Sequence, residues 1–339
     1  MLQSIIVGFG RSGQYLHLPC IKKAAFSAEN KQLFKQNILI VDPFIEKNNC
    51  IEPLPLYRSI YELVKCNPNV IKDSVLHICT PPNQHVPTIM EGVNLGFKNI
   101  IVEKPLTTNI KELNKLIEYS EDKDINIIII ANWLSSSLTY KIKDHIDNGL
   151  YGNVREILLE QDKPRFSRSI NNTSHTNAFE VETPHQLALA CYLLGVNTKI
   201  VHSKIYDMNI DQKKLVGMGG AEITLQHPSG SLCFIKSNLT SLVRKRMIKV
   251  SFDEYTIVGY YPSGSDDSYS KFMLFNKNHQ LITSELIYDD SLSSCFLEYY
   301  TYFNDMKSKK PVSDMHFNKQ VVAMLDQAKK LAIENLIIN

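Results

Sequence analysis

The chain begins with a glycine-rich turn placed directly after a short apolar segment. Residues 4–7 (SIIV) are suited to a buried strand, and they lead into GFGRSG at residues 8–13. In this GxGxxG pattern the first glycine allows a tight turn, the second lets the backbone approach a pyrophosphate, and the third permits a helix to pack closely on the strand. The amino end of that helix offers unpaired N–H groups to an anion. The pattern therefore predicts an α/β sheet whose first loop binds a dinucleotide.

Apolar segments and helical patterns alternate over the first third of the chain. Further buried strands are expected at residues 38–41, 74–78, 100–102 and 125–131, with helices between them. Strands that alternate with helices form parallel sheets covered on both faces. Residues 1–131 are therefore predicted to form a doubly wound Rossmann domain.

From residue 132 onward, strand patterns follow one another with few helices between them. Strands are expected at residues 155–161, 199–206, 220–227, 231–238, 247–258, 271–275 and 280–288. Helices are expected at residues 139–148, 181–194 and 317–336. Runs of strands without intervening helices favour antiparallel pairing. Residues 132–339 are therefore predicted to form an α+β domain with a mostly antiparallel sheet.

Length, charge and cysteine usage exclude several classes of protein. A chain of 339 residues exceeds the size at which a single hydrophobic core stops growing, which agrees with two domains. The formal net charge of +2 gives no reason to expect nucleic acid, and no apolar stretch approaches the ~20 residues that span a membrane. Seven scattered cysteines without a CxxC pair indicate reduced thiols and no metal site. With no signal-peptide pattern at the amino terminus, we expect a cytoplasmic protein.

The segment NIIVEKPL at residues 99–106 brings charged side chains to the end of a predicted strand. Glu103 and Lys104 follow the apolar run, and Pro105 stops the hydrogen-bond ladder. Because the carboxyl ends of strands in an open α/β sheet face the ligand crevice, Lys104 is a candidate proton donor or charge anchor. The alternative is a solvated Glu-Lys pair at a strand end.

Asp42 ends the second predicted strand, where a carboxylate is expected to bind the adenine ribose. Such a carboxylate accepts hydrogen bonds from a 2′-hydroxyl and repels a 2′-phosphate, which favours NAD over NADP. Arg11 argues in the other direction, because a guanidinium nearby could bind that phosphate. A turn or helix-cap aspartate is the alternative for Asp42.

Taken together, these motifs resemble the GFO/IDH/MocA family of NAD(P)-dependent oxidoreductases. The matching segments are GFGRSG with His17-x-Pro19, the TPPNQH turn at 80–85, EKPL at 103–106, GLYGNV at 149–154, the helix bearing His185, and the tail from Glu298 to Pro311. The resemblance implies a Rossmann domain and a second domain whose open-faced antiparallel sheet binds the substrate and builds a homodimer or homotetramer. It also implies oxidation or reduction of a secondary alcohol or ketone on a sugar, sugar phosphate, sugar nucleotide or inositol.

The resemblance assigns roles to individual residues. Lys104 would polarise the carbonyl or relay the proton, and His185 would be the general acid/base. The residues expected to bind the cofactor are Gly8, Phe9, Gly10, Arg11, Ser12, Gly13, Asp42, Thr80, Pro81, Pro82, His85, Glu103 and Lys104. The residues expected to bind the substrate are Lys104, Trp133, Lys163, Arg165 and His185.

Two positions depart from the family pattern. Val181 stands where an aspartate is expected, four residues before the histidine, and Glu182 is the candidate to take over as the catalytic carboxylate. An arginine that commonly follows the last Rossmann strand is absent, and Trp133 lies in that segment. Trp133 would stack on a sugar face, or else pack in the core or at an interface. For His185 the alternative is packing at a helix start, and for the basic run at 163–168 it is a solvated loop.

The sequence thus predicts an NAD-dependent oxidoreductase, and Val181 keeps a second hypothesis open. That hypothesis is a dinucleotide-binding sensor or regulatory protein without turnover, and a third is a reductase of a non-sugar substrate such as a linear tetrapyrrole. For the expected homo-oligomer, Phe252, Tyr255 and Ile257 are predicted to contribute to an apolar outer face of the second sheet.

Overall fold

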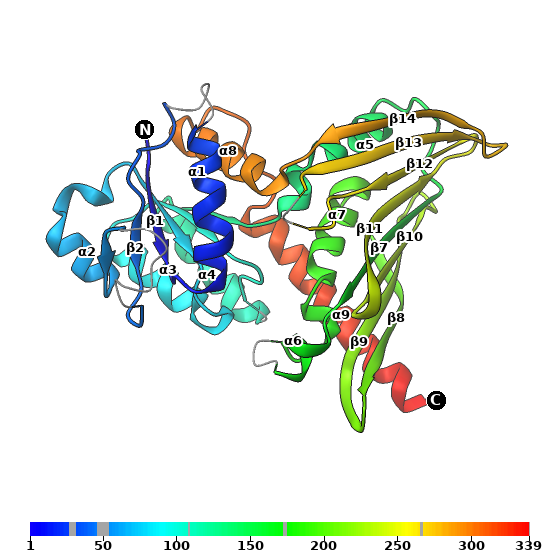
Figure 1. Cartoon of the computed structure of the whole chain (residues 1–339), viewed down its shortest axis with the longest axis horizontal. Helices are drawn as coiled ribbons and strands as arrows, with labels where there is room; N and C mark the ends of the chain where they lie inside the picture. Colours follow the sequence, from blue (N-terminus) through cyan, green and yellow to red (C-terminus); the bar gives the residue numbers. More distant parts are fainter. Residues whose placement is uncertain (27–31, 46–53, 108, 172–174, 265–266, 339) are drawn as a thin grey trace. The chain divides into compact units, whose positions relative to one another are not determined.

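The computed structural model divides the chain into two compact units. It describes residues 1–26, 32–45, 54–107, 109–171, 175–264 and 267–338. The first unit consists of Met1–Asn132 and Leu292–Lys319, and the second of Trp133–Ser291 and Gln320–Asn339. The elements of each unit can be followed in Figure 1.

The first unit is built on a six-stranded parallel sheet in the order β3-β2-β1-β4-β5-β6. Its strands are β1 (Gln3–Val7), β2 (Leu39–Val41), β3 (Leu56–Tyr57), β4 (Ser74–Ile78), β5 (Asn99–Val102) and β6 (Asn126–Ile129). The strand order reverses between β1 and β4, which is the switch point of a Rossmann fold. The central strands are almost continuously apolar, as expected for strands covered on both faces. The predicted doubly wound parallel sheet is confirmed.

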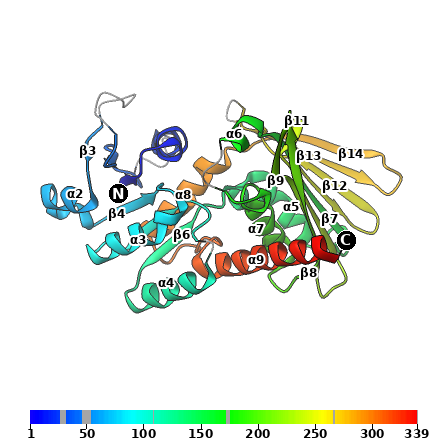
Figure 2. The ribbon, with the colours of Figure 1, turned by 90° about the horizontal axis from the view of Figure 1, so that it is seen from below.

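Helices cover both faces of this sheet. They are η1 (Gly13–His17) with α1 (Leu18–Phe26), α2 (Ile60–Cys66), α3 (His85–Asn94), α4 (Ile110–Asp122) and α8 (Ser291–Asn304). On one face Ile21 of α1 and Phe296 of α8 share a core cluster with Ile101 of β5. On the other face α3 lies so close to β4 that a Cβ added to Gly92 would be 2.5 Å from Leu76 Cδ1. Figure 2 shows α3 and α4 on the side of the sheet opposite α1.

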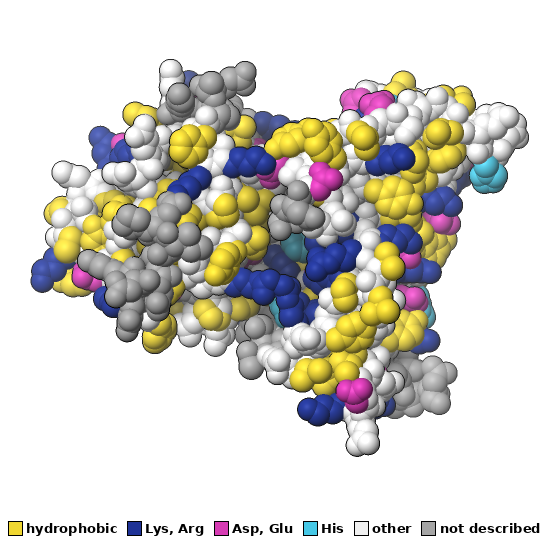
Figure 3. All heavy atoms as spheres, in the orientation of Figure 1, with side chains coloured by type: hydrophobic (Ala, Val, Ile, Leu, Met, Phe, Trp, Pro, Cys, Tyr) yellow, Lys and Arg dark blue, Asp and Glu magenta, His cyan; other side chains and the backbone are white. Residues whose placement is uncertain are grey.

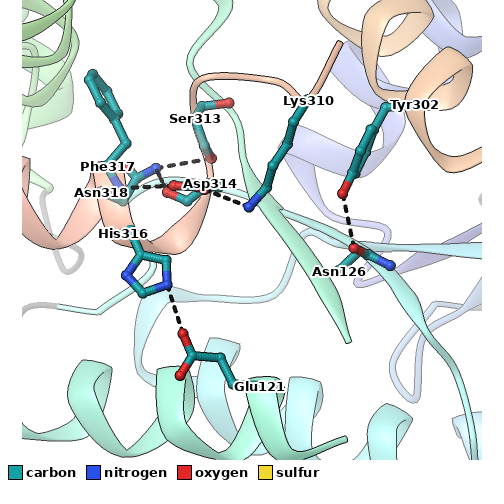
Figure 4. A network of polar contacts seen from close by, with 9 residues as sticks. All are labelled: Glu121, Asn126, Tyr302, Lys310, Ser313, Asp314, His316, Phe317 and Asn318. Atoms are coloured by element: carbon teal, nitrogen blue, oxygen red, sulfur yellow. Dashed lines mark hydrogen bonds and ion pairs between the residues drawn. The ribbon is translucent and has the colours of Figure 1, made fainter. Parts of the chain in front are cut away.

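The chain returns to the first unit near its carboxyl terminus. Figure 4 shows the polar contacts that hold this segment, up to the start of α9 (Met315–Ile338), against β6 and α4. The pairs drawn there are Tyr302 Oη with Asn126 Oδ1 (3.3 Å) and His316 Nε2 with Glu121 Oε1 (2.8 Å). In addition, Ile129 N donates a backbone hydrogen bond to Ser313 O at 2.9 Å. Asp314 caps α9 by accepting a hydrogen bond from Phe317 N at 2.9 Å. Neither α8 nor this return was predicted from the sequence.

The second unit is built on an eight-stranded sheet in the order β14-β13-β12-β11-β7-β10-β9-β8. Its strands are β7 (Glu156–Pro164), β8 (Lys199–Ile210), β9 (Lys213–Gln226), β10 (Leu232–Asn238), β11 (Thr240–Ser251), β12 (Tyr255–Tyr260), β13 (Tyr269–Asn276) and β14 (Leu281–Tyr288). Only β7 and β10 pair in parallel within the described sheet. The predicted second domain with a mostly antiparallel sheet is therefore confirmed.

One expected strand of the second unit is wrong. Residues 247–258 form parts of two antiparallel strands, β11 and β12, because the chain turns back between them. Phe252 N donates to Tyr255 O at 2.9 Å and closes this turn. Ile257 is fully buried and Phe252 is only 6% exposed, so both side chains pack in the core of the unit. They do not supply the apolar outer face that the oligomer prediction assigned to them.

Helices α5 (Ser137–Asp147), α6 (Phe166–Ile170), α7 (Thr183–Leu194) and the later part of α9 complete the second unit. Most residues of α7 are buried, as expected for a helix enclosed on nearly all sides. The visible face of this unit carries hydrophobic side chains interspersed with Lys and Arg (Figure 3). The exposed apolar side chains of its sheet include Val216, Leu242, Val243, Leu281, Ile282 and Leu286. No helix in the described part of the chain is long and apolar enough to cross a membrane.

Candidate functional site

The glycine-rich loop follows β1 at the carboxyl edge of the parallel sheet. Gly8 has a φ of +88°, and a Cβ there would lie 2.8 Å from Thr80 N. A Cβ on Gly13 would lie 2.4 Å from Gly8 O, so neighbouring backbone atoms exclude a side chain at both positions. Gly10 is different, because it is exposed and a Cβ there would meet nothing within 4 Å. Open space above Gly10 fits the close approach of a pyrophosphate.

Asp42, at the end of β2, holds the glycine loop in place through a hydrogen bond to its backbone. Its Oδ2 accepts a hydrogen bond from Phe9 N (2.7 Å), and its Oδ1 accepts from Phe44 N (2.8 Å) and Ile45 N (3.1 Å). Asp42 is thus a turn aspartate, the alternative that the sequence left open, and its side chain is buried. Because a carboxylate accepts about four hydrogen bonds, these contacts leave room for a ribose hydroxyl. The Phe9 side chain is buried in the core, so only its backbone faces the loop.

The turn after β4 and the EKP segment after β5 are joined by His85. Its imidazole is buried, with Nδ1 2.9 Å from Pro105 O and Nε2 2.8 Å from Thr80 O. Burial lowers the pKa of His85, although the two carbonyl contacts oppose this. Asn83 lies within a 3₁₀ turn (Pro82–Gln84) that precedes α3, and α3 has no side-chain cap hydrogen bond.

The hydroxyl of Thr80 has no hydrogen-bond partner among the described residues, although it is buried. A buried polar atom without a partner is costly unless water or a ligand satisfies it. Together with the open space at Gly10 and the amino end of η1, this hydroxyl fits the binding of a dinucleotide along the edge of the sheet.

Glu103 connects the EKP segment to the glycine loop. Its Oε1 accepts hydrogen bonds from Ser12 Oγ (2.6 Å) and His17 Nε2 (3.1 Å), and its Oε2 accepts from Lys104 N (3.2 Å). Burial opposes ionisation of Glu103, but the contacts with His17 and Ser12 and the charge of Lys104 outweigh it and lower the pKa to about 2. Ser12 and Lys104, predicted from separate motifs, are thus brought to one anionic group. The Glu-Lys pair is not merely a solvated strand end.

In the second unit, the start of α7 differs from the prediction. The helix begins at Thr183 rather than Val181, with Pro184 in its first turn, where proline is tolerated. Glu182 is therefore the N-cap residue and does not lie on a helical face with His185. Its backbone carbonyl accepts from His185 N at 3.0 Å. Val181 is buried in the core.

The Glu182 carboxylate is held by two residues of β7. Lys163 Nζ forms an ion pair with Oε1, and Gln161 Nε2 donates to Oε2. The carboxylate is deeply enclosed, since Glu182 as a whole is 8% exposed. Two predicted site residues, Lys163 and Glu182, therefore meet, although the sequence analysis assigned them separate roles. Gln161 was missed, and its only sequence signal is an inward-facing polar residue in an otherwise alternating strand.

Trp133 lies in the interior beside His185. The indole stacks on Tyr261 with a centroid separation of 5.0 Å, and the His185 ring is 6.1 Å away. Since Trp133 is only 6% exposed, this geometry favours packing over stacking on a sugar. His185 itself is half-buried, as is Arg165, which precedes α6.

Comparison with known proteins agrees with this architecture. Residues 2–130 match the model of the GFO_IDH_MocA oxidoreductase family, which has an NAD-binding Rossmann fold. The match covers the Rossmann unit, which is therefore an NAD(P)-binding domain of this family's type, and its glycine loop corresponds to the dinucleotide loop.

Curated relatives of this chain include Oxidoreductase P35 of Formosa agariphila, 28% identical over 36% of this chain and 41% of the relative. Another is myo-inositol 2-dehydrogenase of Thermotoga maritima, 23% identical over 69% of this chain and 67% of the relative. The chain thus spans less than half of the first relative and about two thirds of the second.

Solved structures share the whole fold at low sequence identity. UDP-N-acetylglucosamine 3-dehydrogenase GnnA of Acidithiobacillus ferrooxidans superposes with a TM-score of 0.74 at 13% identity, covering 97% of both chains. A mutant of KijD10, a 3-ketoreductase of Actinomadura kijaniata in complex with TDP-benzene and NADP, superposes with a TM-score of 0.73 at 12% identity, also over 97% of both chains. These similarities establish the two-domain fold.

Proposed function

We propose that this protein is an NAD-dependent oxidoreductase that transfers a hydride between nicotinamide and a secondary alcohol or ketone of a sugar, sugar phosphate, sugar nucleotide or inositol. The observation that carries the proposal is the 2.6 Å hydrogen bond from Ser12 Oγ to Glu103 Oε1. It joins the dinucleotide loop to the EKP segment and so brings Lys104 to the cofactor edge. The inositol and sugar-nucleotide enzymes among the relatives support a polyol substrate.

Lys104 and His185 are the proposed catalytic residues. Lys104 would stabilise the charge that develops on the reacting oxygen, and His185 would exchange the proton with the substrate hydroxyl. The bound nicotinamide would supply or accept the hydride. Glu182 would fix Lys163 at the end of β7, because the two already form an ion pair. The basic segment would then contribute Arg165 to substrate binding.

We further propose a preference for NAD over NADP. Asp42 places a carboxylate at the end of β2, and a 2′-phosphate bound there would be repelled. Arg11, which is exposed in the glycine-rich segment at residues 8–13, would favour NADP, because its guanidinium could bind the 2′-phosphate. The NADP in the KijD10 complex shows that this fold also accommodates the phosphorylated cofactor.

A dinucleotide-binding sensor without turnover is the second candidate. The observation in its favour is Val181, an apolar and fully enclosed residue where the family pattern has an aspartate. A sensor would bind NAD and leave every candidate substrate unchanged.

The decisive experiment follows NADH absorbance with a panel of sugars, sugar phosphates, sugar nucleotides and inositols, using NAD and NADP separately. With the best substrate, Lys104→Ala and His185→Ala should each lower kcat about a hundredfold, or roughly 3 kcal/mol. Lys111→Ala and His202→Ala, at exposed positions, are the matched controls. Unchanged turnover in both catalytic variants would refute the assignment. NAD binding without turnover of any substrate would favour the sensor.

A further inference from the structure

A series of hydrogen bonds between buried polar side chains of the first unit leads to Glu103, at the edge of the sheet where the cofactor is expected. Its links are Ser4 Oγ to Tyr300 Oη (2.6 Å), Tyr300 Oη to His77 Nε2 (2.8 Å), His77 Nδ1 to His17 Nδ1 (3.0 Å), and His17 Nε2 to Glu103 Oε1 (3.1 Å). The first four residues are buried, and they come from β1, α8, β4 and η1. Neither histidine received a role from the sequence, and the proposed reaction uses neither.

The chemistry of the last acceptor fixes the direction of the hydrogen bonds. A carboxylate only accepts, so His17 must donate through Nε2–H. When the His17 ring carries that single proton, Nδ1 accepts from His77 Nδ1–H. His77 Nε2 then accepts from the Tyr300 hydroxyl, which accepts in turn from Ser4. Every link has one donor and one acceptor, and all of them point toward Glu103, an arrangement in which neighbouring hydrogen bonds strengthen one another.

We propose that His17 is a positioning residue that acts through Glu103, by fixing which carboxylate oxygen is presented to the cofactor. Oε1 accepts from both Ser12 and His17, which fills the two acceptor directions of a carboxylate oxygen. Oε2 accepts a hydrogen bond from Lys104 N, and the side chain is 17% exposed. We infer that Oε2 is the oxygen presented to a hydroxyl of the bound dinucleotide. This assignment rests on the proposed function only for the identity of that hydroxyl.

The groups around Glu103 support a role in charge as well as in position. The titratable side chains that face it are His17 from η1, Lys104 beside it, Cys79 after β4 and His85 at the start of α3, with His77 behind His17. Burial, followed by the adjacent His17, lowers the pKa of His77 well below its ordinary value. His77 is therefore neutral, and it holds His17 through a hydrogen bond without carrying a charge of its own.

The test is a titration of NAD into His17→Leu and His17→Gln, with the free energy of unfolding measured in parallel. Leucine removes the donor, whereas the glutamine amide keeps one N–H for Glu103 and one oxygen for His77 Nδ1–H. His17→Leu should weaken NAD binding roughly tenfold at neutral pH, and His17→Gln should remain within about threefold of wild type.

The pH profile separates positioning from a purely structural role. The Glu103 carboxyl has a pKa of about 2 in the native protein, so its charge is constant from pH 8 to pH 5. Without His17, burial would raise the pKa of Glu103, and NAD affinity of the leucine variant should fall relative to wild type as the pH is lowered over this range. A parallel profile in wild type and leucine variant, or equal affinity at neutral pH, would overturn the proposal.

Two adjacent phenols of α8 give a matched control. Tyr300→Phe breaks this series of hydrogen bonds, whereas Tyr299→Phe removes an equally buried hydroxyl that bonds to Ser313 at 2.8 Å. Tyr300→Phe should weaken NAD binding about threefold and Tyr299→Phe should not, even if both lower stability. Equal losses of NAD affinity in the two tyrosine variants would overturn the proposal. This comparison decides the question even if His17→Leu does not fold. This test measures NAD affinity and needs no substrate. If no substrate is turned over, the proposed reaction is refuted, but the role of His17 can still be tested.

Discussion

The two units hold their candidate carboxylates in different ways. In the first unit, Glu103 accepts hydrogen bonds from the Ser12 hydroxyl and the His17 imidazole. In the second unit Glu182 is enclosed beside α7 and neutralised by Lys163. Glu103 is therefore held by hydrogen-bond donors from its own unit, whereas Glu182 forms an ion pair with Lys163. The comparison suggests that the first unit uses its carboxylate toward a ligand and the second uses its own to hold a substrate-binding segment.

The largest effect is expected from substitutions in the glycine loop, which test whether the first unit binds the ligand. A Cβ at residue 13 would clash with Gly8 O, so Gly13→Ala should cost about 3 kcal/mol of unfolding free energy and abolish measurable NAD binding. Gly10→Ala should leave stability within about 0.5 kcal/mol but weaken NAD binding, because its Cβ enters the ligand space. Urea unfolding and NAD titration measure both quantities. Identical behaviour of the two variants would show that the backbone does not define the cofactor site.

Acid unfolding tests how strongly the first unit stabilises its anion. Because the pKa of Glu103 is about 2 in the folded state against 4.5 ordinarily, its contribution to stability is present above about pH 4.5 and is lost as the pH falls toward 2. Linkage puts this contribution on the order of 3 kcal/mol. Glu103→Gln, which cannot titrate, should therefore lose less stability than wild type over that interval. Unfolding curves at stepped pH that run parallel for the two proteins would contradict the assignment.

Removing the Lys163–Glu182 ion pair of the second unit should lower stability by a smaller amount, and the effects of the two substitutions should not be additive. Lys163→Met leaves Glu182 enclosed without its cation and should cost about 2 kcal/mol, below the range for fully buried pairs because both side chains retain some exposure. Adding Glu182→Gln should recover part of this loss, since a neutral amide no longer needs the cation. Additive losses in the double-mutant cycle would mean that the two residues act independently.

Cofactor choice should show the smallest effect. Asp42→Asn keeps one oxygen for the turn around Phe44 but removes the charge, so the ratio of NAD to NADP affinity should fall about tenfold, mainly through tighter NADP binding. Calorimetric titration with both cofactors measures the ratio, and Arg11→Ala is the complementary variant. An unchanged ratio in Asp42→Asn would mean that the carboxylate serves only the turn and the loop.

Local motifs account for what the sequence predicted well. The GFGRSG turn and the EKP segment each depend on a few consecutive residues, because a strand end, a glycine conformation and a helix start are set by neighbours in the chain. The alternation of strands and helices likewise predicted the parallel sheet. Where a turn signal was weak, the prediction was wrong, and residues 247–258 became two strands instead of one.

The amino-acid sequence by itself thus determined the Rossmann architecture, the mostly antiparallel second sheet and the loops at the cofactor edge. Only the tertiary structure decided which side chains meet. His77 and Tyr300 are 223 residues apart, and they touch only because α8 returns to the first unit. Lys163 reaches Glu182 because β7 ends beside the start of α7. The reason is physical: a backbone conformation is dictated by adjacent residues, but a hydrogen bond or ion pair needs a register and a chain path that no local pattern encodes.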